Sequence, residues 1–300
     1  MRILLFGKNG QVGGELQRSL AALGELVALD RSTAGLCGDL EDLDGIRRTI
    51  REVRPDAVVN AAAYTAVDRA ESDPELCRKV NALAPEVIAT EAARIGAWLA
   101  HYSTDYVFDG SGDRPWTEDD PVAPLSVYGA AKAEGEARIA AAAPLHLILR
   151  TSWVYAASGT NFINTMLKLG QERERLTVVD DQHGTPTGAE LIAAVTARIL
   201  PAAMGAGGLA GIYHLVPAGE TTWFDYARHI FSCARATGLP IKAAVDPVPS
   251  SAYPTAARRP HNSRLDNRKL QAAFGLRLPP WQHGVEHVLA GRTGAVRASP

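Results

Sequence analysis

The turn after the first apolar segment constrains the fold of this chain more than any other feature. Residues 2–6 read RILLF, and Gly7, Gly10 and Gly13 follow this short apolar run, with an amphipathic helical pattern over 11–23. A strand, a glycine turn and a helix in this order form the context that a dinucleotide-binding fingerprint requires. Gly7 would permit the tight turn, Gly10 the approach of a pyrophosphate, and Gly13 the close packing of helix on strand.

The spacing of these glycines is G-x-x-G-x-x-G, which an ordinary strand–helix turn also tolerates. The next segment favours the dinucleotide reading, because residues 25–29 (ELVAL) predict a second strand that ends at Asp30. An acidic residue about 20 positions after the glycines is placed to bond the adenosine ribose. Asp30 favours NADH because a carboxylate repels a 2′-phosphate, whereas Arg31 can accept that phosphate. NADH and NADPH therefore both stay open as cofactors.

Tyr128 and Lys132 are four residues apart in a segment, 128–143, that reads as a helix. Residues at this spacing share one helix face, so both side chains would point at the same spot. A free tyrosine has a pKa of about 10, and we expect the ammonium to lower it toward neutrality. Thr104 adds a hydroxyl that can hold a carbonyl oxygen. The set predicts a general acid for a carbonyl that receives hydride, although this spacing also occurs on ordinary surface helices.

Further apolar runs alternate with helical patterns along the first half of the chain. Strands are expected at about 57–60, 97–103 and 145–151, with helices between them. This alternation predicts an α/β fold, namely a Rossmann-type doubly wound parallel sheet with a smaller, partly interleaved C-terminal substrate domain. Sites in such sheets lie beyond the carboxyl ends of the strands.

The regular alternation of expected strands and helices ends at about Trp153, which suggests where the domains divide. The NAD(P)-binding Rossmann domain is expected over 1–152 and again over about 180–211. The substrate-binding elements are expected over about 153–179 and 212–290, followed by a flexible tail at 291–300. The Gly/Ala-rich stretch 202–211 reads as a surface loop.

Composition limits the classes of partner. The chain has 300 residues, 46% of them hydrophobic and 21% charged, which fits a globular protein with a sizeable core. A net charge of −2 gives no support for a nucleic-acid or membrane-surface partner. We expect no signal peptide and no membrane span. Cys37, Cys77 and Cys233 match no metal or redox pattern, so we expect free thiols and a cytoplasmic location.

Several segments resemble one family over nearly the whole chain. Beyond the glycine turn and the Tyr128/Lys132 pair, the resemblance rests on six blocks: NAAAYTAVDRAE from Asn60, HYSTDYVFDG from His101, YGAAKAEGE from Tyr128, RTSWVY from Arg150, DDQHGTPTGAEL from Asp180 and SSAYPTAARRPHNSRL from Ser250. The chain resembles the extended short-chain dehydrogenase/reductases and, more narrowly, the family that reduces dTDP-4-dehydrorhamnose. The glycines and the Tyr/Lys pair mark only the superfamily, and the later blocks point to the narrower family.

The resemblance implies a role for each of several side chains. The pyrophosphate would lie on Gly10, Gln11 and Val12. The rest of the dinucleotide would contact Asp30, Asp39, Leu40, Ala63, Tyr64, Thr65, Tyr102 and Lys132. The sugar would contact Thr104, Asp105 and Trp153. The implied reaction is NAD(P)H-dependent reduction of the C4 keto group of dTDP-4-dehydro-L-rhamnose, which would supply rhamnose for cell-surface polysaccharide.

Two other functions stay open at this point. Reductase-like folds also serve as regulatory subunits that bind a dinucleotide without catalysis. A related nucleotide-sugar epimerase or epimerase-reductase would share the same fold and the same Tyr/Lys pair. The presence of Thr104, Tyr128 and Lys132 together favours catalysis, while the 250–265 loop and Trp153 favour the dehydrorhamnose substrate.

The substrate implied by the resemblance carries a diphosphate, so cations are expected near it. Arg258, Arg259 and Arg264 lie in one short loop, where Tyr253 could wall the thymine or its linker, although a solvated basic loop would look the same.

The resemblance also allows a homodimer bridged by Mg²⁺ at Glu15 and Glu190, but a third carboxylate position falls at about Gly291. We therefore predict no firm metal site. His283, Glu286 and His287 match H-x-x-E-H, an inverted zinc-protease pattern, but no acidic, histidine or cysteine residue follows them, and a solvated helix face explains them better.

Overall fold

The computed structural model describes residues 1–292. Its centre is a six-stranded sheet in which every neighbouring pair is parallel. The strands lie in the order β10 (Gly211–His214), β5 (His146–Thr151), β4 (Trp98–Thr104), β3 (Ala57–Asn60), β1 (Arg2–Phe6) and β2 (Glu25–Leu29). Such a sheet is buried on both faces, which explains the uninterrupted apolar runs in its strands.

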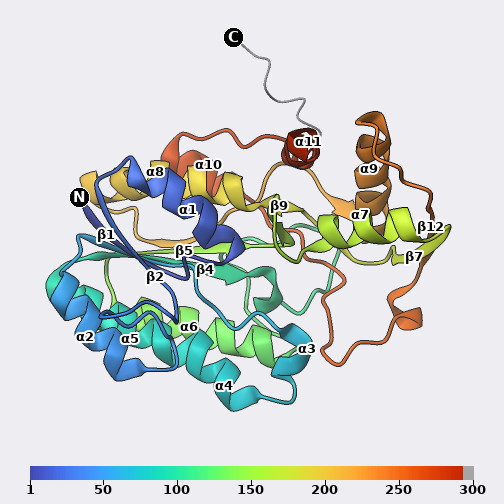
Figure 1. The fold of residues 1–300 in the computed structure, drawn as a ribbon. Helices are drawn as coiled ribbons and strands as arrows, with labels where there is room; N and C mark the ends of the chain where they lie inside the picture. Colours follow the sequence, from blue (N-terminus) through green and yellow to red (C-terminus); the bar gives the residue numbers. More distant parts are fainter. Residues whose placement is uncertain (293–300) are drawn as a thin grey trace, which may run out of the picture.

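Helices cover both faces of this sheet, as Figure 1 shows. One face carries α1 (Gln11–Ala21), α8 (Ala189–Gly205) and α10 (Arg268–Phe274). The other carries α2 (Leu43–Val53), α5 (Ala84–Ile95) and α6 (Val127–Ala142). The short helices α3 (Val67–Ala70), α4 (Pro74–Arg78) and the π-helical turn η1 (Lys79–Leu83) lie between β3 and α5 in the chain. This arrangement confirms the predicted doubly wound α/β fold.

A smaller group of elements lies beside the sheet, to the right in Figure 1, and has a hydrophobic core of its own. Its helices are α7 (Phe162–Glu172), α9 (Trp223–Ala236) and α11 (Trp281–Arg292). Its strand pairs are β7 (Arg175–Val179) with β12 (Ala244–Val248), β6 (Val154–Tyr155) with β9 (Thr187–Gly188), and β8 (His183–Gly184) with β11 (Thr221–Thr222). The remaining elements are two 3₁₀ turns, η2 (Asp105–Val107) and η3 (Ser250–Ala252).

The order of the strands fixes where a ligand can lie. Strand β1 lies between β2 and β3, so the connections that leave β1 and β3 cross to opposite faces of the sheet. Parallel sheets bind ligands outside the carboxyl ends of their strands at such a switch point. The register aligns Phe6 with Leu29 and with Asn60, and Thr104 with Thr151, so these strand ends form one edge.

Some expected boundaries differ from those in the structure. The stretch 202–211 is not a loop throughout, because α8 continues past Pro201 to Gly205. Proline removes one helical hydrogen bond, but Ala203 is buried on the sheet-facing side and holds the helix in place. Strand β10 begins at Gly211, next to the proposed domain boundary, which stays a prediction. Of the proposed tail, residues 291–292 form the end of α11 and the rest lies outside the described residues. No helix among residues 1–292 is both long and apolar enough to span a bilayer.

Candidate active site

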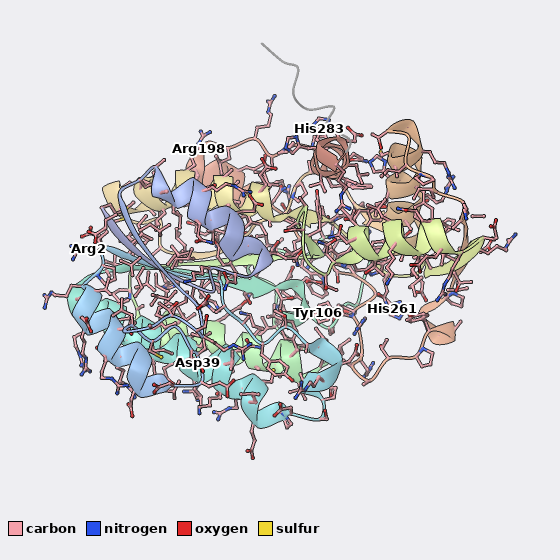
Figure 2. All side chains as sticks on the ribbon, in the orientation of Figure 1. Arg2, Asp39, Tyr106, Arg198, His261 and His283 are labelled. Atoms are coloured by element: carbon pink, nitrogen blue, oxygen red, sulfur yellow. The ribbon has the colours of Figure 1, made fainter. Side chains whose placement is uncertain are left out.

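A cleft of about 620 Å³ lies at the switch point between β1 and β3. It gathers most of the residues expected around the dinucleotide, from segments that are distant in the sequence. Its lining includes Gly7, Gly10, Asp30, Arg31, Asp39, Leu40, Ala63, Tyr64 and Thr65. Figure 2 labels Asp39, which lies on the same side of the sheet as α2 and α5.

The glycine turn is built for close backbone approach. Gly7 has a φ of +86°, and a Cβ there would lie 2.7 Å from the Ala62 nitrogen. A Cβ at Gly13 would collide with the Gly7 carbonyl, so α1 packs directly on the turn. The N-cap of α1 is Gly10, which offers no side-chain cap. The first amide N–H groups of the helix are therefore available to an anion, and the turn fits a dinucleotide pyrophosphate.

Asp30 is already surrounded by donors at the end of β2. Its carboxylate accepts 2.9 Å hydrogen bonds from the Ser32 amide, the Ser32 hydroxyl and the Thr33 hydroxyl, and a further bond from Asn9. The Lys8 ammonium lies 3.7 Å from the same carboxylate. The Ser32 hydrogen bond and its neighbours hold the pKa of Asp30 below its ordinary value. The negative charge that would oppose a 2′-phosphate is thus partly balanced.

Thr104 and Tyr128 meet where α6 docks onto the end of β4. Thr104 is the last residue of β4, and its hydroxyl accepts a 3.2 Å hydrogen bond from the Tyr106 amide. Ser126 caps α6 by accepting from the Gly129 amide at 3.1 Å. A Cβ at Gly129 would collide with the Tyr106 carbonyl, so only glycine lets the helix start this close to β4. Figure 2 shows Tyr106 in the middle of the molecule, between the sheet and the smaller group of elements.

Burial, rather than Lys132, sets the pKa of Tyr128. Burial raises that pKa above its ordinary value, the Asp105 carboxylate raises it further, and a hydrogen bond with Thr104 opposes both. The expected net lowering of the pKa toward neutrality therefore does not occur, and Lys132 is not among the groups that shift it. The Lys132 ammonium is held elsewhere, since it donates to the Tyr102 carbonyl at 2.6 Å. Tyr128 consequently keeps its proton at neutral pH, as a general acid must.

Sequence reasoning missed His101, which contacts Lys132 inside the protein. The Lys132 Nζ lies 3.1 Å from His101 Nε2, and His101 Nδ1 lies 3.1 Å from the side-chain nitrogen of Asn60. Burial lowers the pKa of Lys132 to about 8. Burial and the Lys132 charge together lower the pKa of His101 well below its ordinary value, so the imidazole is neutral. The only signal in the sequence is a histidine within an otherwise buried strand.

Asp105 follows Thr104 and is almost fully buried. Its Oδ1 accepts a 3.0 Å hydrogen bond from the Thr104 hydroxyl, whereas its Oδ2 has no partner among the described residues. Burial raises the pKa of Asp105 to about 6, and the neighbouring Ser263 side chain opposes this shift in part. Ser263 belongs to the 250–265 loop, so that loop reaches the end of β4. An unpartnered, buried carboxylate oxygen suits a sugar hydroxyl as its donor.

Trp153 lies in a strained position next to the smaller group of elements. Its φ is +47°, a left-handed conformation that non-glycine residues rarely adopt. Its ring stacks on that of Trp223 with the centroids 3.7 Å apart. Trp223 begins α9 and carries no recognisable sequence signal for this role. The stack holds the Trp153 ring despite the backbone strain.

The arginines of the 250–265 loop differ in how they are held. Arg259 is half-buried and donates to the Asp68 carboxylate at 2.7 Å. Arg258 is exposed and has no ion pair among the described residues. Arg264 lies 3.4 Å from a Glu220 carboxylate oxygen. Tyr253 is 62% exposed, and its contact with the substrate stays a prediction.

Glu15 and Glu190 line a separate cavity of about 320 Å³, together with His283 and His287. The Glu15 carboxylate pairs with Arg18, and that of Glu190 lies 3.5 Å from His287 Nε2. The H-x-x-E-H motif does not converge on one point, because its Glu286 faces His229 on α9 instead. Figure 2 shows His283 on α11, seen nearly end-on.

Comparison with known proteins agrees with this geometry. The family model described as RmlD substrate binding domain matches residues 1–293. The chain is 54% identical to the dTDP-4-dehydrorhamnose reductase of Escherichia coli K12 over 96% of this chain and 97% of that protein. Two solved dTDP-4-dehydrorhamnose reductases have TM-scores of 0.89. That of Clostridium acetobutylicum is 35% identical, and that of Bacillus anthracis, solved in complex with NADP, is 33% identical; each covers 97% of this chain and 99% of the other. The chain therefore belongs to the RmlD family, the family of the dTDP-4-dehydrorhamnose reductases.

Proposed function

We propose that this chain catalyses the NAD(P)H-dependent reduction of the C4 keto group of dTDP-4-dehydro-L-rhamnose to give dTDP-L-rhamnose. The observation that carries the proposal is the meeting of Thr104, Tyr128 and the buried Asp105 at the end of β4, beside the glycine turn of a dinucleotide site. The family relatives named above act on this substrate by their names. A regulatory subunit would need none of these buried polar groups.

The residues of this chain bind and protonate the oxygen of the keto group. The bound reduced nicotinamide supplies the hydride that reaches C4. The Thr104 hydroxyl, whose single proton goes to Asp105 Oδ1 in this structure, would turn to donate to the keto oxygen as negative charge develops there, and Tyr128 would transfer its phenolic proton to the same oxygen. The Lys132 ammonium, held by Tyr102 and His101, would contact the dinucleotide, and solvent returns a proton to the Tyr128 phenolate.

The two halves of the molecule divide the binding. Residues 1–152 and about 180–211, together with β10, would hold the dinucleotide through the glycine turn, Asp30 and the cleft at β1 and β3. Residues 153–179 and 212–290 would hold the nucleotide sugar. Asp105 would accept a hydroxyl of the sugar, Trp153 would cover its ring, and Arg259 would bind the diphosphate. The three free thiols support a cytoplasmic location.

The test follows reduced-nicotinamide absorbance with NADH and with NADPH, using dTDP-4-dehydro-L-rhamnose generated in situ. Oxidation that requires the sugar establishes the reductase. Tyr128→Phe should lower kcat by about 10²–10⁴-fold and leave dinucleotide binding nearly unchanged. Tyr106→Phe is the matched control, because its ring lies 5.9 Å from that of Tyr128, centroid to centroid. Equal activity in Tyr128→Phe and the parent, or dinucleotide binding without any turnover, would refute the proposal.

A further inference from the structure

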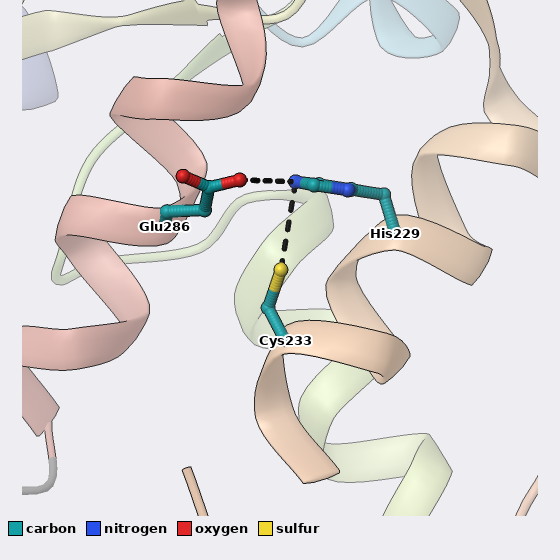
Figure 3. A group of neighbouring side chains, drawn as sticks. All are labelled: His229, Cys233 and Glu286. Carbon is teal, nitrogen blue, oxygen red and sulfur yellow. Dashed lines mark hydrogen bonds and ion pairs between the residues drawn. The ribbon is translucent and has the colours of Figure 1, made fainter. Parts of the chain in front are cut away.

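Three side chains of different chemistry converge between α9 and α11, and none of them is among the residues proposed for catalysis. His229 and Cys233 are one turn apart on α9, and Glu286 faces them from α11, as Figure 3 shows. His229 Nε2 lies 3.5 Å from Cys233 Sγ and 3.7 Å from a Glu286 carboxylate oxygen. The three ligand atoms all lie within 4.8 Å of one another. Among the described residues, no other group of this kind brings three such atoms together.

These separations are close to the edges of a tetrahedral zinc site. With Zn–N of about 2.05 Å, Zn–S of about 2.3 Å and Zn–O of about 2.1 Å, a tetrahedral angle places N and S about 3.6 Å apart and N and O about 3.4 Å apart. The nitrogen and sulfur already have the required separation, and the nitrogen and oxygen are within a few tenths of an ångström of it. Only the distance between the Glu286 carboxylate oxygen and Cys233 Sγ must become shorter. Glu286 can move, because its side chain is 52% exposed.

We propose that His229, Cys233 and Glu286 form a binding site for a Zn²⁺-like transition metal, which ties α9 to α11. A thiolate with an imidazole selects such a metal over Mg²⁺, which prefers oxygen ligands. Binding displaces the thiol proton to solvent and forms the metal–sulfur bond. Water completes the fourth position, on the side where His229 and Glu286 reach solvent.

The surroundings favour a structural clamp. His229 is three-quarters buried, and its ring packs edge-on against Trp281, with the centroids 4.9 Å apart. Trp281 belongs to the core of the smaller group of elements, which also contains Tyr226 of α9. The first residue of α9 is Trp223, which stacks on Trp153. A metal between α9 and α11 would therefore stiffen the elements that hold Trp153, whatever reaction the chain catalyses.

The experiment measures metal binding directly. Full-length protein is freed of metal with a chelator and titrated with Co²⁺ alone. We expect one Co²⁺ per chain, with a thiolate-to-cobalt absorption band in the near ultraviolet, and Zn²⁺ should displace the Co²⁺. Cys233→Ser should abolish the band, and Glu286→Gln should weaken binding by about tenfold or more.

Two controls separate this site from others. Cys37→Ser removes another free thiol, and His287→Gln removes the histidine of the neighbouring cavity; both should bind as the parent does. Metal-free unfolding temperatures of all four variants should match that of the parent, and the exposed Glu286 makes Glu286→Gln the safest of them. Three outcomes would overturn the proposal. The parent binds no Co²⁺, the absorption band survives Cys233→Ser, or binding is lost only in His287→Gln.

Discussion

Asp105→Asn should remove a pH dependence of stability that arises from the buried Asp105 carboxylate. The folded pKa of Asp105 is about 6, above the ordinary value of 3.8. Between these values the folded chain holds a proton that the unfolded chain releases. The free energy of unfolding therefore falls as pH rises from about 3.8 to about 6, and the full cost of the ionised side chain is present above pH 6.

The size of this effect follows from the two pKa values. A difference from 3.8 to about 6 corresponds to about 3 kcal/mol at 25 °C. Asparagine keeps an acceptor for Thr104 but buries an amide N–H₂ where Oδ2 has no partner, which costs about 1–3 kcal/mol. That cost is the same at every pH. Between pH 3.8 and pH 7 the free energy of unfolding of the variant should therefore rise by about 2.5 kcal/mol relative to that of the parent, whichever of the two is more stable at either end.

Urea unfolding of the parent and the variant at several pH values between 4 and 7 measures this difference in the free energy of unfolding. Asp120→Asn is the control whose difference from the parent should stay nearly constant in this window, because Arg114 holds Asp120 at 2.6 Å and lowers its pKa, so the carboxylate is ionised in the folded chain throughout. Asp120 contributes stability above the unfolded pKa, and that contribution is lost as the pH falls. A difference between Asp105→Asn and the parent that stays constant from pH 4 to pH 7 would refute the reasoning.

Three further substitutions test the site. Gly13→Ala should weaken dinucleotide binding and cost about 1–3 kcal/mol of stability, because the added Cβ would collide with the glycine turn. Gly14→Ala should do neither, since its Cβ would lie 4.0 Å from the nearest atom. Fluorescence titration with NADPH and thermal unfolding compare the two variants. The loss of kcat at alkaline pH is expected near pH 8, and His101→Leu should move it to lower pH because Lys132 loses a partner. His101→Gln should return this loss to near pH 8. An unchanged pH profile in His101→Leu would contradict the proposed contact between His101 and Lys132. Arg259→Met should raise KM for the nucleotide sugar about tenfold or more, since it would lose a charged hydrogen bond to phosphate, while Arg258→Met should change KM less; equal effects would argue against selective binding by Arg259.

The parts of the site that could be predicted from sequence are those set by local backbone rules. The glycine turn, the strand that ends at Asp30 and the Tyr128–Lys132 helix each depend on spacing within a few residues. Contacts between distant elements could not be read in this way. His101 faces Lys132 only because β4 lies against α6, and the direction of the Tyr128 pKa depends on burial by the surrounding elements.

Helical periodicity also hides local departures from the helix. Between the strands expected at about 57–60 and 97–103, the helical pattern contains both α4 and the π-helical turn η1. In that turn, the Asn81 side chain accepts from the Tyr64 amide and donates to the Tyr64 carbonyl, both at 2.9 Å. Single-turn π-bulges often occur at functional sites, and here the bulge fixes the backbone of a residue that lines the dinucleotide cleft.

The crowded carboxylate at the end of β2 has a consequence for metabolism. Asp30 is encircled by hydroxyl, amide and ammonium groups, and Arg31 beside it is largely exposed. The protein thus offers neither a bare negative charge that would exclude a phosphorylated ribose nor a dedicated cationic pocket that would demand one. The choice of reductant would then depend on supply: sugar reduction would use whichever of NADH and NADPH is more abundant around the enzyme.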